Sequence, residues 1–117
     1  MQRTGVRDLL PLSPKTFHVL LALAGEERHG YAIAKAIEAE TEGMIRLTPG
    51  TLYPLIRQML VDGWIVEVYG SDGDDPRRRL YRLSPLGRRI AQAEAARMND
   101  LVRLARSHKL LTAAGQT

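Results

Sequence analysis

The 117-residue sequence predicts a mainly α-helical fold of the α+β class that contains one small β-hairpin. Three observations lead to this prediction. The segments 14–24, 31–40 and 48–61 repeat apolar residues at helical spacing. Segment 64–83 has two runs rich in β-branched and aromatic residues around a turn-rich centre, and 84–111 lacks proline and glycine after its first turn. This order of elements is typical of a winged helix-turn-helix with a long last helix.

Composition limits the class of protein further. A chain of this length with 44% hydrophobic residues predicts one domain. The absence of cysteine excludes disulfides and thiolate metal sites, and no apolar run approaches the roughly 18 residues of a membrane span. The N-terminus has no signal-peptide pattern, so we expect a cytoplasmic protein without membrane association. A net charge of +4 favours a polyanionic partner.

The first predicted helix, 14–24, begins after Ser13 as the N-cap, with Pro14 as the first helical residue. Residues 1–12 precede it and have two interpretations: a frayed tail, or a short N-terminal arm that docks on an apolar surface. The expected buried stripe of the helix consists of Phe17, Leu20, Leu21 and Ala24.

The second predicted helix, 31–40, is half exposed. Ile33 and Ile37 are expected to be buried, while Tyr31, Lys35 and Glu38 line the opposite side. The segment 44–47 that follows is too short for a helix, and its residues predict a small strand.

The third predicted helix begins at Thr48, with Pro49 as its first residue and a slight kink at Pro54, and it ends at Asp62-Gly63. Its two faces differ. The apolar face consists of Leu52, Leu55, Ile56, Met59 and Leu60, and the opposite face of Gly50, Tyr53, Pro54, Arg57 and Gln58. The second face suits a helix that enters a DNA groove with its N-terminus first. A plain solvated face is the alternative.

The predicted hairpin pairs 64–69 with 78–83 around the turn-forming segment 70–76. On a winged helix this hairpin is the wing. Three arginines beside its turn are then expected to contact phosphates: Arg77, Arg78 and Arg79. Trp64 either packs between the third helix and the wing or stacks on a small-molecule effector. Asp72, Asp74 and Asp75 are interpreted as an acidic tip of the wing.

The last predicted helix is too long to bury its apolar side against three short helices. The rest of its apolar side is therefore expected to pack against a second copy, together with the first helix and the N-terminal arm. The predicted dimerisation residues are Leu9, Leu10, Ile90, Met98, Leu101, Val102 and Ala105. The predicted organisation is thus an arm at 1–12, a winged helix-turn-helix at 13–83, a dimerisation helix at 84–111 and a frayed tail at 112–117.

Four blocks of this sequence together resemble the PadR family of bacterial transcriptional regulators. They are His29–Lys35, Thr48–Leu55, Asp62–Ile65 and Arg79–Gly87, and the resemblance extends over about 13–111. It implies a homodimeric winged-helix repressor on double-stranded DNA, with the last helix supplying most of the dimer contact. In several family members a small molecule releases the DNA. Gln58 and Leu60 depart from the usual family pattern, which affects the groove contacts more than the fold.

The expected DNA contacts follow from the fold and the resemblance together. They are Tyr31, Lys35, Thr48, Gly50, Thr51, Tyr53 and Arg57, in addition to the three arginines of the wing. No arrangement of residues predicts catalysis, and the three histidines lack companions at metal-ligand spacing, so we expect neither an enzyme nor a cofactor. Two other functions stay open: a winged-helix module that binds a protein, and a multidrug sensor with an apolar pore at the dimer interface.

Overall fold

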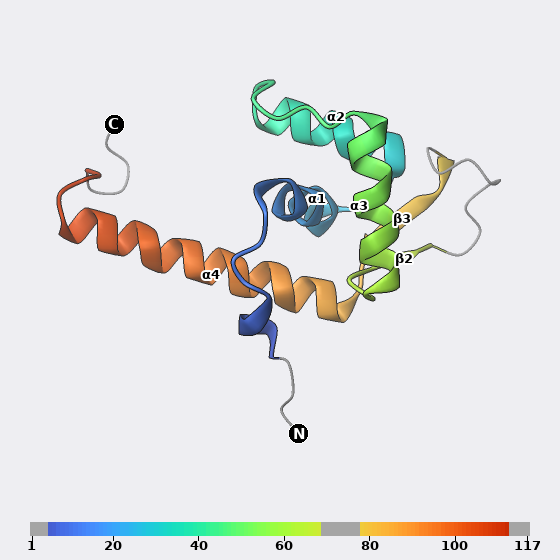
Figure 1. Cartoon of the computed structure of the whole chain (residues 1–117). Helices are drawn as coiled ribbons and strands as arrows, with labels where there is room; N and C mark the ends of the chain where they lie inside the picture. The colour runs from blue at the N-terminus through green and yellow to red at the C-terminus, as the bar shows by residue number, and fades with distance from the viewer. Residues whose placement is uncertain (1–4, 69–77, 113–117) are drawn as a thin grey trace.

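The computed structural model describes residues 5–68 and 78–112, and its helices α1 to α3 pack with a small sheet while α4 projects from them (Figure 1). This arrangement confirms the predicted mainly helical fold with a small β-structure. The elements in chain order are η1 (Val6–Leu9), α1 (Pro14–Gly25), β1 (Arg28–His29), α2 (Gly30–Glu40), α3 (Pro49–Val61), β2 (Ile65–Glu67), β3 (Leu80–Leu83) and α4 (Pro85–Ser107).

Local sequence signals set the starts of three helices. Proline is the first residue of α1, α3 and α4, where a missing backbone N–H leaves no hydrogen bond unmade. The Ser13 hydroxyl accepts a hydrogen bond from the Thr16 N–H at 3.2 Å, and the Ser84 hydroxyl accepts one from the Gly87 N–H at 3.0 Å. The predicted start of α3 after Thr48 is confirmed.

The sheet has three antiparallel strands in the order β1-β3-β2. The two strands of the predicted hairpin are present, although Tyr69, the segment 70–76 and Arg77 lie outside the described residues. The strand predicted at 44–47 is wrong. The Ile45 N–H is bonded to the Thr41 hydroxyl at 3.0 Å, so this segment follows a local turn, and the third strand is β1 instead. Arg28 lies opposite Tyr81 in that pairing.

The hydrophobic core lies where α1, α2, α3, β3 and the start of α4 meet. Leu20, Ile33 and Ile56 are each at most 2% exposed there. The prediction that Leu21 belongs to the buried stripe of α1 is wrong, because this residue is 39% exposed. Helix α1 contacts α2, β3 and α4, so its buried face is wider than one stripe. That face also includes Val19, Ala22 and Leu23.

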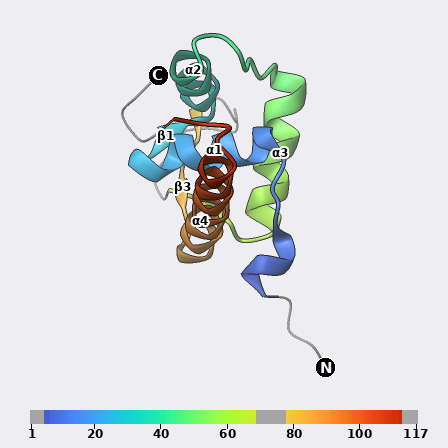
Figure 2. The same ribbon diagram turned by 90° about the vertical axis from the view of Figure 1, so that its left-hand side faces the viewer.

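Helix α4 is buried only in its first half. Its buried residues are Gly87, Ile90, Ala91 and Glu94, and Figure 1 shows the rest of the helix extending away from the core, while Figure 2 views the helix end-on. Ile90, one of the predicted dimer contacts, is 0% exposed within its own protomer, so its side chain belongs to the protomer core. The helix also ends at Ser107 and not at 111, since Lys109 adopts a φ of 61°.

The N-terminal arm docks on its own chain. Val6, Leu9 and Leu12 pack against the core, and η1 contacts α4. The Leu12 N–H donates a hydrogen bond of 2.8 Å to the carboxylate of Glu94. For residues 5–12 the docked arm is thus the correct interpretation, although residues 1–4 and the end of the predicted tail, 113–117, lie outside the described part of the chain.

Glu94 is a buried carboxylate with two partners. It is 0% exposed, and Arg97 donates to both of its oxygens in addition to the bond from Leu12. These hydrogen bonds, that from Arg97 above all, hold the pKa of Glu94 below its ordinary value, although burial acts in the opposite direction. The hydrogen bonds from Leu12 and Arg97 stabilise the buried charge of Glu94. Because Leu12 belongs to the arm, its bond also joins the arm to α4 in one packed unit.

None of the helices in 5–68 or 78–112 is both long and apolar enough to cross a membrane.

Candidate nucleic-acid interface

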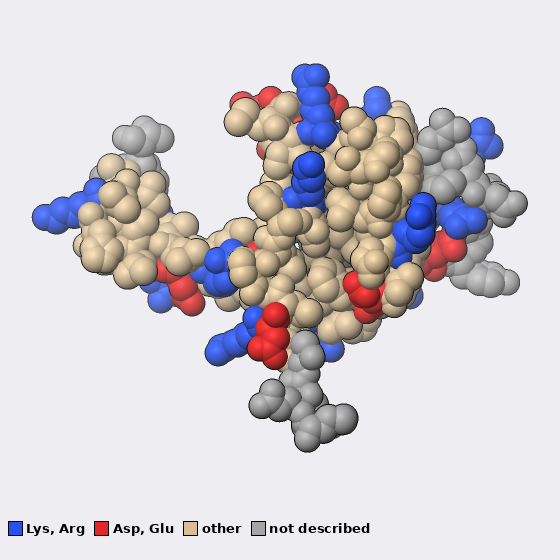
Figure 3. All heavy atoms as spheres, in the orientation of Figure 1, with Lys and Arg blue, Asp and Glu red and all other residues tan. Residues whose placement is uncertain are grey.

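The two faces of α3 differ as the periodicity predicts. Leu52, Ile56 and Met59 are buried, whereas Gly50, Arg57 and Gln58 are exposed. Figure 3 shows basic side chains around this side of the molecule, with uncharged surface between them and acidic side chains beside several of them. Helix α3 follows α2 through a short connection and is followed at once by β2, so its exposed face lies between α2 and the hairpin.

The N-terminus of α3 offers an open approach to the backbone. Gly50 is exposed, and a Cβ built on it would meet no atom within 4 Å. The Thr48 hydroxyl makes no capping bond to the backbone and lies 3.3 Å from the hydroxyl of Thr51. The helix dipole adds a partial positive charge here, so this end of α3 has the properties of an anion-binding surface.

Helix α2 contributes a tyrosine and a lysine to the same side. The Lys35 ammonium lies 5.2 Å from the centroid of the Tyr31 ring, within range of a cation–π contact. Tyr31 is 53% exposed, which is more than a residue used only for packing requires. The two side chains therefore form one outward-facing aromatic and cationic pair.

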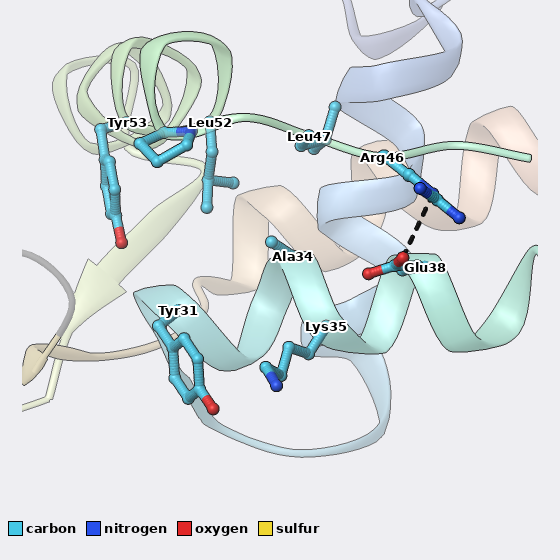
Figure 4. A pocket seen from close by; sticks show the side chains of 9 residues that line it. Tyr31, Ala34, Lys35, Glu38, Arg46, Leu47, Leu52 and Tyr53 are labelled. Carbon is cyan, nitrogen blue, oxygen red and sulfur yellow. Dashed lines mark ion pairs between the residues drawn. The ribbon is translucent and has the colours of Figure 1, made fainter. Parts of the chain in front are cut away.

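A groove separates this pair from the start of α3. Its volume is about 250 Å³. Figure 4 shows Tyr53 and Leu52 extending from α3 toward α2, while Tyr31 and Lys35 leave α2 side by side. At the other end Arg46 forms an ion pair of 3.2 Å with Glu38.

The hairpin base approaches the other side of α3. Arg57 and Arg79 both line a second, smaller cavity of about 80 Å³ between α3 and β3. Arg79 also forms an ion pair of 3.3 Å with Glu67, so part of its charge is compensated within the hairpin. Arg78 is exposed, and Arg77 lies outside the described residues. The buried Tyr81 lines the same cavity, and burial raises the pKa of its hydroxyl.

Trp64 lies at the junction between α3 and α4. Its side chain is partly buried against the core. Its carbonyl oxygen accepts a hydrogen bond of 3.0 Å from the Ser84 N–H, and the Ser84 hydroxyl donates to the carbonyl of Gly63. A Cβ on Gly87 would lie 1.9 Å from the Trp64 carbonyl oxygen. The end of α3 and the start of α4 are therefore tightly joined, while effector binding by Trp64 stays a prediction.

Sequence reasoning missed parts of this surface. It identified the tyrosines and Lys35 but not the apolar lining of the groove, which includes Ala34 and Leu47. The spacing of residues 31, 34, 35 and 38 on one side of α2 is a signal for part of it. This spacing carries no information on Leu47, which reaches the groove from the connection between α2 and α3.

Comparison with known proteins identifies a family and a relative. Residues 19–93 match the transcriptional regulator PadR-like family. The transcriptional regulator Rv3488 of Mycobacterium tuberculosis is 34% identical over 87 residues, which cover 74% of this chain and 77% of that protein.

Solved structures show a similar fold. A transcriptional regulator from Clostridium thermocellum, Cth-833, has a TM-score of 0.64 at 21% identity, with 83% of this chain and 97% of that chain covered. Bacillus subtilis PadR in complex with operator DNA has a TM-score of 0.59 at 18% identity, with 71% of this chain and 46% of that chain covered.

Proposed function

Because this chain belongs to the PadR-like family of transcriptional regulators, we propose that it binds double-stranded DNA as a homodimer and represses transcription from an inverted-repeat operator. The observation that carries this proposal is the exposed face of α3, with an accessible glycine at its N-terminus and Arg57 two turns later. The operator complex of Bacillus subtilis PadR supports the choice of DNA as the partner.

In the proposed complex α3 enters the major groove. The open backbone at Gly50 permits close approach to the duplex, and the hydroxyls of Thr48 and Thr51 are placed to bond phosphates or base edges. Arg57 is long enough to reach a guanine or a phosphate. Tyr53 contributes to the same face as a partly buried residue.

Residues on both sides of α3 hold the phosphate backbone in this proposal. Tyr31 and Lys35 contact it from α2, where their cation–π pair already faces outward. Arg78 and Arg79 contact it from the base of the wing. These contacts position α3 without reading sequence, so they contribute affinity and salt dependence.

The second half of α4 is proposed to form the dimer. Met98, Leu101, Val102 and Ala105 follow one another at the spacing of a single helix face. Leu101 is 51% exposed, so this face offers apolar surface that the protomer does not cover. Leu9 and Leu10, half-buried beside α4, are proposed to extend it.

The junction at Trp64 is proposed to connect DNA binding by α3 with dimerisation by α4. Because the Ser84 hydroxyl and the close contact at Gly87 join α4 to the end of α3, the angle between two α4 helices sets the separation of two α3 helices. A separation of about 34 Å places them in successive major grooves. An effector that changes this angle, at Trp64 or elsewhere, would release the DNA.

Salt-dependent DNA binding tests the proposal. The labelled duplex is the region upstream of the protein's own gene, and fluorescence anisotropy measures its affinity between 50 and 200 mM salt, with a scrambled duplex for comparison. Arg57→Ala with Arg78→Ala should reduce the slope of log affinity against log salt by about 4, since the dimer loses four phosphate contacts and each lost contact removes roughly one ion.

A matched variant controls for net charge. Arg103→Ala with Arg106→Ala removes two charges from exposed positions on α4 and should leave the slope unchanged. Equal slopes for the unaltered protein and the Arg57/Arg78 variant would contradict the proposed contacts, and equal affinity for the two duplexes would contradict an operator.

A further inference from the structure

One stripe of the exposed face of α3 carries a single side chain that can form hydrogen bonds. Gly50, Pro54 and Gln58 follow one another at intervals of four residues, which places them on one side of the helix, and all three are exposed. Gly50 has no side chain, and the ring of Pro54 has no donor or acceptor. Gln58 is therefore the residue of this stripe that can bond to a partner lying along it.

The position of Gln58 along α3 suits contact with a base. At a rise of about 1.5 Å per residue, Gln58 lies about 12 Å from Gly50 along the helix axis, which corresponds to roughly three to four base pairs of duplex. When α3 lies in the major groove with the backbone at Gly50 against the duplex, Gln58 faces base pairs of the same groove.

Asp62 fixes the orientation of the Gln58 amide. The Gln58 Nε2 donates a hydrogen bond of 3.0 Å to the Asp62 carboxylate. The Asp62 N–H donates one of 2.9 Å to the Gln58 carbonyl, so the end of the helix holds Asp62 in place. Because a carboxylate only accepts hydrogen bonds, a rotation that exchanged Oε1 with Nε2 would place two acceptors against each other. The amide thus keeps one N–H and its oxygen for an external partner.

This combination of one donor and one acceptor matches one base. In the major groove adenine presents the N7 acceptor and the N6 donor, whereas guanine presents two acceptors, N7 and O6. An amide of fixed orientation can donate to N7 and accept from N6 of adenine. Against guanine its oxygen would face O6, and neither atom would have a hydrogen bond.

The stability of α3 does not account for Asp62. Its carboxylate lies at the C-terminal end of the helix, where the helix dipole disfavours a negative charge. A duplex bound to α3 would bring phosphates toward the same surface, and like charges repel. A role in orienting Gln58 accounts for an acid at this position.

We propose that Gln58 selects an A·T base pair by bonding to adenine in the major groove, and that Asp62 is the positioning residue that prevents the same amide from accepting guanine. This inference rests on the DNA-binding function proposed above and adds the base that one side chain reads. On an inverted repeat, a homodimer shows the preference at two symmetric positions.

Selection from a library of random duplexes tests the base preference of the full chain. The bound duplexes are sequenced, and anisotropy then measures the affinity for the selected site and for each of its single-base-pair variants. At the two positions read by Gln58, adenine should be preferred over guanine by about tenfold each, within the range of one bidentate contact. Gln58→Ala should abolish the preference at these two positions and leave it unchanged at the others.

Asp62→Asn tests the positioning role. Asparagine keeps the size of the side chain and can either donate to the Gln58 amide or accept from it, so the amide is free to turn. Guanine should then bind about as tightly as adenine at the two positions, whereas a loss of stability alone would weaken binding to all duplexes equally. Gln92→Ala, at an exposed position on α4, is the matched control and should leave every preference unchanged.

The outcomes separate this inference from the proposed function. Base preferences that are the same in Gln58→Ala and in the unaltered protein would overturn the adenine contact while leaving DNA binding intact. So would a preference of the unaltered protein for another base at the positions that Gln58→Ala alters. An Asp62→Asn protein that still rejects guanine would overturn the positioning role. If the unaltered protein selected no site from the library, the proposed function would fail, and this inference with it.

Discussion

The two halves of α4 differ in what covers them. In Pro85–Glu94, Gly87, Ile90 and Glu94 are buried against the rest of the protomer. In 95–107 none of the residues is fully buried, and the exposed side chains include Leu101 at 51% and Leu104 at 55%. A continuous helix therefore serves two purposes: its first half stabilises the protomer, and its second half is available to a partner.

Among substitutions in the first half of α4, Gly87→Ala is expected to reduce the stability of the protein most. A Cβ there would lie 1.9 Å from the Trp64 carbonyl oxygen and 2.8 Å from its carbonyl carbon, which are backbone atoms that cannot move alone. We expect the free energy of unfolding to fall by more than about 3 kcal/mol, or folding to be lost. Chemical denaturation measures this loss.

Gly25→Ala is the control for that substitution, because a Cβ on Gly25 would meet no atom within 4 Å. A Gly87→Ala protein as stable as the Gly25→Ala protein would show that the contact with Trp64 contributes little.

Among substitutions in the second half of α4, Leu101→Asp with Leu104→Asp is expected to weaken dimerisation most. Two charges on the exposed apolar face should prevent dimerisation, and DNA affinity should fall by about 100-fold because a single α3 remains on each molecule. Sedimentation analysis reports the mass, and anisotropy reports the affinity. The protomer should stay folded, since neither leucine belongs to the core.

Arg103→Asp is the control, because it changes the net charge of α4 by the same amount as the two leucine substitutions together. It lies at an exposed position where it pairs with Asp100 at 3.5 Å, and it should leave both mass and affinity nearly unchanged. A double aspartate variant that remained dimeric would place the dimer contact elsewhere.

A smaller effect is expected from Glu94→Gln. The amide still fits beside the Leu12 N–H but loses the charge that faces Arg97, so we expect a loss of about 1–2 kcal/mol in the free energy of unfolding at neutral pH. Its pKa is lowered in the folded state, so the stabilisation is complete above the unfolded pKa and is lost as the pH falls through the folded one. The variant and the unaltered protein should begin to converge as the pH falls below the unfolded-state pKa of about 4.3, and they should become equal only below the folded-state pKa.

Glu38→Gln removes a carboxylate from an exposed pair with Arg46 and provides the matched comparison. Denaturation curves at several pH values distinguish the effect of Glu94→Gln from that of Glu38→Gln. A difference between the Glu94→Gln and unaltered proteins that is the same at pH 3 and pH 7 would show that the charge of Glu94 contributes nothing to stability.

The sequence predicted α3 well because its signals are local. Thr48, Pro49 and Gly63 mark its ends, and the buried positions follow the helical period. The outward pair of Tyr31 and Lys35 on α2 was predictable for the same reason. These features depend on residues within a few positions of one another.

The errors concern contacts that hydrophobic periodicity does not encode. The strand expected at 44–47 is absent because the Ile45 N–H bonds to the Thr41 hydroxyl in a turn, and the strand that pairs with the edge of β3 is Arg28–His29. Leu21 is exposed although it belongs to a helix with strong apolar content, since the neighbours of α1 leave that side uncovered. In both cases the residues satisfied the apolar pattern, and contacts that this pattern does not encode, a side-chain hydrogen bond from Thr41 and the packing around α1, decided the outcome.

For this protein the sequence by itself determined the helices, their caps and the two-sided character of α3, because backbone geometry and helical period are properties of neighbouring residues. Only the tertiary structure decided that α4 is covered as far as Glu94 and open beyond it, and that Leu47 completes a groove with Tyr31. Burial depends on which distant surfaces meet, and periodicity shows that a face is apolar without showing what covers it.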